Sequence, residues 1–327
     1  MSNILFISPS FFDYYKELKR ELENQGNIVY WFDDRPKTNV IQKFLLRKKR
    51  VLLKKKIDRY FYNILQEMSN KKINIVFIIL GQSFSVRHIE ILKKKFNMAQ
   101  FIYYTWDSVK NFPSSLELSK RFDVAYSFDN DDVKKYAHLK FLPLFFYDIS
   151  AIDNNKIFDF SFVGTIKKGK YKIIFNIINK LKKDFPNHYV YMYLQHKLVF
   201  VFYKIFSNEF KTAKMRDFNY KPLSKEKTLD VFKKSKVVLD IPMSDQVGLT
   251  ERTFETLSLQ TKLLTTNINI KKYDFYNNKN IFVSENGNIP EKVFFIEQYD
   301  LNYNLSNKYN ISNFIHKILC SEINGNN

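Results

Sequence analysis

The sequence predicts an α/β protein of two domains, each built on a parallel sheet with helices on both faces. Its 327 residues suit two domains of ~100–200 residues each. Near-continuous apolar runs alternate with helical patterns through both halves, which is typical of strands buried on both faces. Only 7 Gly and 8 Pro are present, against a turn-rich all-β protein. Right-handed crossovers then make both sheets doubly wound and Rossmann-like.

Residues 1–150 form the first predicted domain. Its strand-like runs are 3–8, 27–33, 74–80, 100–105, 123–128 and 140–145, and its helical patterns are 12–24, 40–68, 86–95 and 130–136. The first helix follows Ser8-Pro9-Ser10, which has capping chemistry but lacks the Gly-rich dinucleotide fingerprint. This absence argues against a nicotinamide or flavin enzyme.

Residues 151–305 form the second predicted domain, after a polar, aperiodic linker. Its strands are 159–166, 189–194, 237–242, 263–266 and 280–283, and its helices are 171–184, 198–206, 225–234 and 250–260. The terminal segment 306–327 has apolar residues at 311, 314, 315, 318 and 319, a helical stripe.

The formal charge of +20 indicates an anionic partner: nucleic acid, an anionic membrane surface or a phosphate-bearing substrate. No zinc-finger spacing or RNA-binding aromatic signature appears, so nucleic acid is disfavoured. Residues 42–56, QKFLLRKKRVLLKKK, predict a basic amphipathic helix with two open interpretations. It lies on an anionic bilayer, or it packs on the core with a solvated basic face.

The expected cellular compartment is inferred from features that the sequence lacks. The single Cys320 cannot form an intramolecular bridge, which fits a reducing compartment. No leader pattern precedes the first strand, and the apolar runs are far shorter than the ~20 residues of a spanning helix. We therefore expect a soluble, cytoplasmic protein.

Residues 236–267 contain the strongest functional signal, a strand, a Gly-bearing loop, a helix and a second strand. The loop and helix start fall at the carboxyl ends of parallel strands, where open α/β sheets bind ligands and where a helix favours an anion. Arg252 and Glu255 lie three residues apart, on one helix face. Together they can hold a diphosphate and a ribose hydroxyl pair, which predicts a nucleotide-sugar site.

This segment resembles the donor-binding core of GT-B glycosyltransferases, in particular family-four enzymes and their spore-maturation-like relatives. Within residues 248–265, the matching residues are Gly248, Leu249, Arg252, Phe254, Glu255, Leu257, Leu263, Leu264 and Thr265. The resemblance implies two Rossmann-like domains facing a cleft, a donor bound by the second domain, an acceptor bound by the first, and a last helix that crosses back to the first.

Two positions of this segment depart from the family pattern, and a third departure is Thr165, where the family usually has Arg. Gln260 stands where the family has a helix-ending Gly, so a residue with a Cβ must make the tight turn. Val247 stands where the family-four pair has its first acid. Retaining and inverting chemistry both stay open.

A second donor-binding segment opens the later half of the chain. It is a strand ending in Gly164 and Thr165, then a turn with Lys167, Lys168 and Lys170, which predicts a diphosphate cradle. Thr250 is a further candidate donor contact. The alternatives are a merely solvated Lys-rich turn, an Arg252–Glu255 salt bridge, and a Glu255 that is simply exposed.

The first domain is expected to supply the acceptor side. Asp107, in YYTWDS, is the candidate general base for an inverting reaction, and Trp106 offers a surface for a sugar ring. The alternative is that Asp107 caps the next element. Ser8, Gly81 and Gln82 are the other predicted cleft residues.

No Asp-x-Asp pair or zinc-ligand spacing occurs, so we expect no metal and no cofactor. Arg252 and the lysines at 167–170 must then stabilise the departing nucleoside diphosphate. Asp240 and Pro242 are expected only to end their strand, and Asp245 to cap a helix.

The sequence thus predicts a metal-independent, hexosyltransferase-like enzyme. It would move a sugar from a nucleoside-diphosphate donor to a glycan or lipid-linked acceptor in bacterial lipopolysaccharide or capsule synthesis, with peripheral contact at the anionic inner membrane face. The alternative is a degenerate GT-B module that binds a nucleotide or glycan without turnover.

Overall fold

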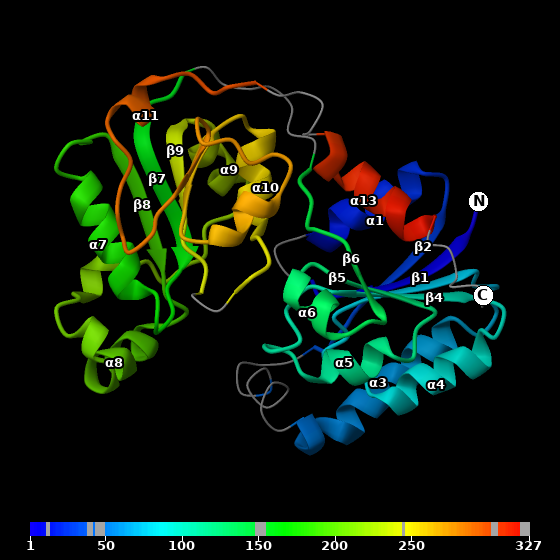
Figure 1. The fold of residues 1–327 in the computed structure, drawn as a ribbon. Coiled ribbons are helices and arrows are strands. Elements are labelled where there is room, and N and C mark those ends of the chain that lie inside the picture. Colours follow the sequence, from blue (N-terminus) through cyan, green and yellow to red (C-terminus); the bar gives the residue numbers. More distant parts are fainter. Residues whose placement is uncertain are drawn as a thin grey trace. The chain divides into compact units, whose positions relative to one another are not determined.

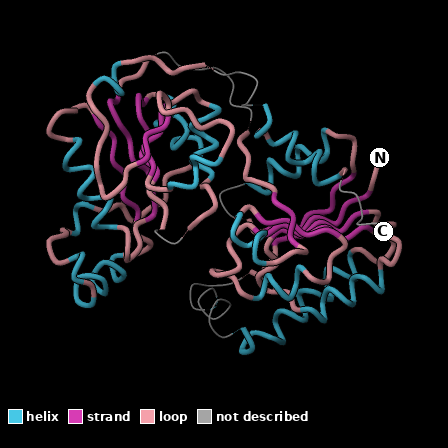
Figure 2. The backbone as a smooth tube through the Cα atoms, viewed as in Figure 1, coloured by secondary structure: helices cyan, strands magenta, loops and turns pink. Residues whose placement is uncertain are grey.

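The computed structural model describes residues 1–10, 14–37, 42, 50–147, 155–243, 246–301 and 307–320. The chain forms two compact units, Met1–Pro143 with Ile311–Asn327, and Leu144–Asn310. Each unit has one parallel sheet with helices on both of its faces (Figures 1 and 2), which confirms the predicted fold class.

Unit 1 holds a six-stranded sheet in the order β2-β1-β3-β4-β5-β6, with every neighbouring pair parallel. Its strands are β1 (Asn3–Ser8), β2 (Ile28–Asp33), β3 (Ile75–Ile79), β4 (Gln100–Thr105), β5 (Val124–Ser127) and β6 (Leu139–Phe141). Its helices are α1 (Tyr14–Asn24), α3 (Lys54–Glu67), α4 (Val86–Lys95), α5 (Ser114–Ser119), α6 (Asn130–Lys135) and α13 (Ile311–Leu319), with the 3₁₀ turn η2 (Arg50–Leu53) before α3.

The main differences from the predicted elements of unit 1 are local. β6 ends at Phe141 rather than at 145, because Pro143 cannot donate to a strand ladder. α5 was not predicted, since six residues are too few to show a helical period. Of the predicted helix 40–68, α3 and η2 are described, and residues 40, 41 and 43–49 lie outside the described part.

The C-terminal helix α13 packs on unit 1, as the resemblance implied. Gln25 at the end of α1 donates from Nε2 to the carbonyl of Ser312 at 3.1 Å. The ring of Phe314 meets Tyr104 of β4 edge to face, with centroids 5.1 Å apart. The apolar stripe of α13 is buried in these contacts, and α13 and α1 lie side by side in Figure 1.

Unit 2 holds a five-stranded parallel sheet in the order β11-β10-β9-β7-β8. Its strands are β7 (Phe158–Thr165), β8 (His188–Tyr193), β9 (Ser235–Asp240), β10 (Lys262–Thr265) and β11 (Ile281–Val283). Its α-helices are α7 (Tyr171–Leu181), α8 (Lys197–Phe206), α9 (Lys225–Lys233), α10 (Glu251–Ser258) and α11 (Val293–Ile296), and its 3₁₀ turns are η3 (Asn208–Phe210), η4 (Met215–Asp217), η5 (Ile268–Lys272) and η6 (Asn307–Tyr309).

Both sheets begin with the doubly wound order 2-1-3-4-5, so strand order reverses between β1 and β3 in unit 1 and between β7 and β9 in unit 2. Ligands of such sheets bind outside the carboxyl ends of the strands at this reversal.

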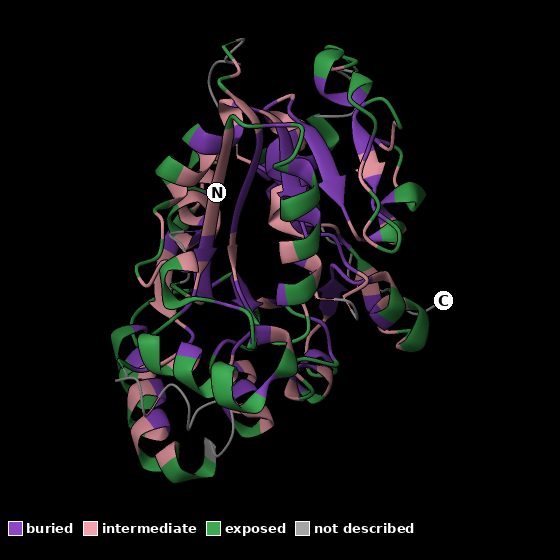
Figure 3. Cartoon of the chain, turned by 90° about the vertical axis from the view of Figure 1, so that its left-hand side faces the viewer, coloured by how far each residue is buried: buried purple, intermediate pink, exposed green. Residues whose placement is uncertain are grey.

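The central strands are rich in buried apolar residues because both faces of each sheet are covered, and they are largely purple in Figure 3. On one face of β7, Phe160 and Phe162 pack in the cluster that contains α7. On the other face, Val163 packs with Phe232 of α9 and Leu259. The sheet of unit 2 is thereby fixed between α7 on one side and α9 and α10 on the other.

The turn after α10 confirms the prediction for Gln260, whose φ is +49°. The N–H of Thr261 donates to the carbonyl of Thr256 at 3.0 Å, and that of Gln260 to Leu257 at 3.3 Å. This is a Schellman turn with a side chain at the position usually held by Gly.

Candidate functional site

Arg252 lies at the strand reversal of unit 2, between the carboxyl ends of β7 and β9. Its Nη1 donates to Oδ1 of Asp240 at 2.7 Å, and its Nη2 donates to the carbonyl of Val163 at 2.5 Å. A Cβ at Gly164 would lie 3.4 Å from Nη2 and 3.0 Å from the ring of Phe162. A side chain at Gly164 would therefore crowd the ring of Phe162 and touch the guanidinium.

Asp240, the last residue of β9, organises the start of α10. It is 1% exposed, and its Oδ2 accepts from the hydroxyls of Thr250 at 2.6 Å and Thr253 at 3.3 Å. Arg252 therefore pairs with Asp240. The alternative interpretation had paired Arg252 with Glu255 instead. The role of Asp240 was missed, because an acid at a strand end carries no sign of its partner.

The guanidinium of Arg252 is held in one orientation, and its bonds to Asp240 and Val163 do not use all of its N–H donors. Two of its five N–H groups make the bonds above. Nε is buried and has no hydrogen-bond partner among the described residues, so further bonds to a ligand would come from Nη1 and Nη2. The side chain remains 19% exposed. A guanidinium held in this way can donate further bonds to a planar or tetrahedral oxyanion.

Glu255 is buried, with 6% of its surface exposed, so the interpretation of Glu255 as a simple exposed residue is wrong. Its Oε1 accepts from Nζ of Lys225, the first residue of α9. Burial lowers the pKa of Lys225 to about 8, and the nearby Arg252 adds to that effect while Glu251 opposes it. Lys225 was not among the predicted site residues, because it lies thirty residues from Glu255 in the sequence.

Lys170 joins the same positive region. Its Nζ donates to the carbonyl of Ile241 at 3.3 Å. Burial lowers its pKa to about 8, with repulsion from Arg252 and Lys167 adding to the shift and attraction to Asp240 opposing it. Lys167 and Lys168 are exposed, and Thr165 is half-buried at the end of β7.

Backbone N–H groups at the Lys-rich turn, residues 167–170, and at the start of α7 already have a hydrogen-bond partner. Gly169 has φ +93°, and its N–H donates to Oε1 of Glu209 at 2.6 Å. Oε2 of the same carboxylate accepts from the N–H of Lys172, in the first turn of α7, at 3.5 Å. A phosphate at this turn would have to displace Glu209, so the side chains rather than these N–H groups are available as its ligands.

The loop before α10 is held by Asn267, which follows β10. Its Nδ2 lies 3.2 to 3.3 Å from the carbonyl oxygens of Gln246, Val247 and Gly248. Leu249 is buried. Asp245, the predicted cap, lies outside the described residues.

In unit 1, Asp107 is exposed two residues beyond the end of β4. Its Oδ1 accepts from the N–H of Ser108 at 3.0 Å and from Nδ2 of Asn111 at 2.9 Å. Trp106 is half-buried against the rings of Tyr14 and Tyr104, at 5.5 and 6.2 Å. The bonds of Asp107 are those of a local turn, and its role as a base stays a prediction.

Ser8, Gly81 and Gln82 follow or end strands at the same edge of the sheet of unit 1. The hydroxyl of Ser8 accepts from Nε1 of Trp31 at 2.9 Å, and Gly81 has φ +66°. The N–H of Gln82 donates to Oδ2 of Asp34 at 2.9 Å. Asp34 was not predicted as a site residue.

Asp34 is a fully buried carboxyl group. Burial raises its pKa to about 7, although Arg35, whose Nε lies 3.2 Å from Oδ1, opposes the shift. It ties the loop after β2 to the loop after β3, which makes it a structural clamp at the carboxyl edge of this sheet.

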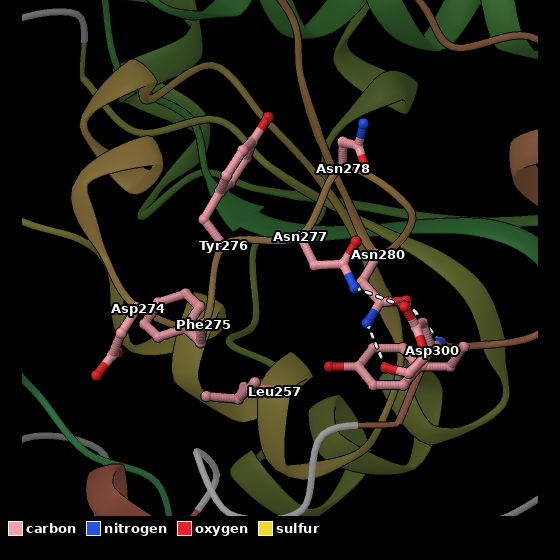
Figure 4. A pocket seen from close by; sticks show the side chains of 9 residues that line it. Leu257, Asp274, Phe275, Tyr276, Asn277, Asn278, Asn280 and Asp300 are labelled. Atoms are coloured by element: carbon pink, nitrogen blue, oxygen red, sulfur yellow. Dashed lines mark hydrogen bonds between the residues drawn. The ribbon is translucent and has the colours of Figure 1, made fainter.

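A pocket of about 450 Å³ lies elsewhere in unit 2, before β11 and beside the end of α10 (Figure 4). It is lined by Leu257, Asp274, Phe275, Tyr276, Asn277, Asn278, Asn280, Tyr299 and Asp300. Asn280 immediately precedes β11, so the pocket is at the amino edge of the sheet, opposite Asp240 and Gly164. Asn277 and Asn280 donate to Asp300 at 2.8 and 2.7 Å. None of the predicted site residues lines it.

No protein-family model matches the chain, and no curated protein matches it in sequence. Among solved structures, a sucrose-phosphate synthase from Thermosynechococcus elongatus has a TM-score of 0.60 at 9% identity over 98% of this chain and 90% of its own. Anabaena HepE, in complex with UDP and glucose, has 0.57 at 11% over 98% and 100%. The lipopolysaccharide outer core galactosyltransferase WaaB has 0.53 at 12% over 98% and 99%. At these identities the likeness is one of fold, and the chain has the GT-B fold that residues 248–265 predicted.

Proposed function

We propose that this protein is a glycosyltransferase that binds a nucleoside-diphosphate sugar in unit 2 and transfers the sugar to a glycan or lipid-linked acceptor. The observation that carries the proposal is the guanidinium of Arg252, fixed by buried Asp240 at the strand reversal. Support comes from HepE, which has a similar fold and whose structures are complexes with UDP and glucose and with UDP-glucose.

The positive side chains have a direct task in such a reaction. Negative charge grows on the nucleoside diphosphate as its bond to the sugar breaks, and fixed cations stabilise that charge. Arg252 and Lys170 are placed for this role, with Lys167 nearby. The carboxylate of Glu255 can accept hydrogen bonds from ribose hydroxyls. We further propose that no metal takes part and that Asp107 is the base if the reaction inverts.

A thermal-shift screen against UDP, GDP, CMP, ADP and dTDP tests the donor site. A ligand at 100 times its Kd stabilises the folded protein by about 2.7 kcal/mol. We expect one nucleotide to stabilise the protein, Glu255→Gln and Lys170→Met to reduce the shift, and Lys183→Met, a change at an exposed lysine beyond the end of α7, to preserve it. The absence of a shift with all five nucleotides would refute the donor site.

A second candidate is a module that binds the nucleotide without turnover. It is favoured by Glu209, which occupies the N–H groups of Gly169 and Lys172, and by Val247 in place of the family-four acid. Slow hydrolysis of the bound donor in the absence of an acceptor would identify an enzyme, whereas binding without hydrolysis or transfer would favour the module.

We also propose a role in bacterial surface-polysaccharide synthesis at the cytoplasmic face of the membrane. Support comes from the lipopolysaccharide outer core galactosyltransferase WaaB, which has the same fold over nearly the full length of both chains. Transfer of radiolabelled sugar to extracted lipid-linked glycan tests this, and transfer only to soluble acceptors would contradict it.

A further inference from the structure

The helix α8 of unit 2 exposes an unusual number of large apolar side chains. Within Lys197–Phe206 only Phe200 is buried. The exposed fractions are 70% for Leu198, 41% for Val201, 57% for Phe202, 67% for Ile205 and 66% for Phe206. A contiguous exposed apolar patch of this kind marks a surface that contacts a partner or a membrane.

The helix has two distinct apolar faces. At ~100° per residue, the five exposed side chains fall within an arc of ~140°. Phe200 and Tyr203 project from the other side and pack in the core cluster with α7 and β7. The outer face is therefore additional to the face that holds the helix on the protein.

The charges around this face are positive. α8 contains Lys197 and Lys204 and no acidic residue. Lys211, Lys214 and Arg216 follow it and are exposed, beside a Met215 that is 41% exposed. The carboxylates of the nearby Glu209 and Asp217 accept hydrogen bonds from backbone N–H groups. Glu209 accepts from Gly169, and Asp217 accepts from Lys214 at 2.8 Å. An apolar face bordered by lysines complements the headgroup region of an anionic bilayer.

The position of α8 links this face to the donor site. The helix begins four residues after the end of β8, at the carboxyl edge of the sheet, and Figure 1 shows it at one end of unit 2. η3 follows directly, and its Glu209 holds Gly169 of the Lys-rich turn. The same edge of the sheet carries Thr165 and Asp240.

We propose that α8 docks unit 2 onto an anionic lipid bilayer and so brings the carboxyl edge of its sheet to the headgroups. No helix in the described part of the chain is long and apolar enough to cross a bilayer, and α8 would lie in the plane of the interface. The benefit of docking for a lipid-linked acceptor rests on the proposed function, but the docking itself does not.

Co-sedimentation with vesicles tests the proposal, using phosphatidylglycerol mixed with phosphatidylcholine and, separately, phosphatidylcholine alone. We expect binding to the anionic vesicles that weakens with salt. The triple variant Phe202→Ser, Ile205→Ser and Phe206→Ser should bind far less, by roughly tenfold for each side chain removed. Because all three side chains are exposed, its melting temperature should not fall.

A second variant reverses charges in a different segment, the basic segment 42–56. Lys54→Glu with Lys55→Glu, on exposed positions of α3, tests the basic segment 42–56 as the docking element. Loss of binding in this variant with full binding in the α8 variant would overturn the proposal. So would a concentration-dependent dimer that the α8 variant abolishes while vesicle binding persists. The nucleotide shift of the α8 variant should be unchanged, which separates failure of docking from failure of the donor site.

Discussion

Replacing Asp240 by Asn tests whether this carboxylate fixes Arg252. The substitution keeps the shape of the side chain and leaves an oxygen that the hydroxyls of Thr250 and Thr253 can still use. It removes the charge that faces the guanidinium at 2.7 Å. Breaking a buried ion pair costs about 3–5 kcal/mol. Because Arg252 is 19% exposed and can recruit water, we expect a loss of roughly 2–3 kcal/mol.

A double-mutant cycle isolates this pair. Asp240→Asn, Arg252→Gln and their combination are compared by urea unfolding, followed by circular dichroism. We expect a coupling free energy of roughly 1–3 kcal/mol, as for residues in one hydrogen-bonded network, with little dependence on salt because the pair is buried. Both tryptophans, Trp31 and Trp106, lie in unit 1, so tryptophan fluorescence serves as an internal control for that unit.

The same variants make a prediction for binding. With Asp240→Asn, the guanidinium loses its fixed orientation but keeps its charge, so nucleotide affinity should fall by about tenfold. With Arg252→Gln the loss should be larger. A coupling below about 0.5 kcal/mol, or unchanged nucleotide binding in Asp240→Asn, would show that the carboxylate does not hold Arg252 for a ligand.

Three further outcomes are expected. Gln260→Gly should raise the free energy of unfolding by about 1 kcal/mol, since φ is +49° there and a Cβ is strained in that region; lower stability would point to a contact of the side chain. Asp34→Asn should stabilise the folded protein at pH 8 by on the order of 4 kcal/mol and should have no such effect at pH 4. The reason is that the carboxyl group of Asp34, with a pKa of about 7 in the folded protein, is charged only at the higher pH. Equal effects of the substitution at pH 8 and pH 4 would contradict this. Nucleotide affinity should fall above pH 8, where Lys170 and Lys225 lose their protons. Calorimetry of Lys170→Met should give weaker nucleotide binding that depends less on pH. An unchanged pH dependence would exclude Lys170 as a ligand of the nucleotide.

The sheets were predictable because strands covered on both faces are rich in apolar residues, as in β3, which is apolar at every position, and in the centre of β9. Arg252, Glu255 and Gly164 were predicted as site residues because they lie at or after strand ends and because Arg252 and Glu255 match the family pattern, and their role in binding stays a prediction. Their partners could not be found in this way. Asp240 faces Arg252 across twelve residues and Lys225 faces Glu255 across thirty, so the pairings depend on how α9 and α10 pack against β9. The sequence 198–206 was identified as a helix, but the exposure of its apolar face depends on the surrounding elements.

The contacts of Glu209 decide how a diphosphate can be held in unit 2. With that carboxylate on the N–H groups of Gly169 and Lys172, the start of α7 offers little to a second anion, since two negative groups at one helix end repel each other. A diphosphate bound as proposed would then rely on the side chains of Arg252 and Lys170. Both are tied to β9, Arg252 through Asp240 and Lys170 through the carbonyl of Ile241 that follows it. The end of β9, rather than the turn after β7, is therefore the element on which the proposed donor binding would depend.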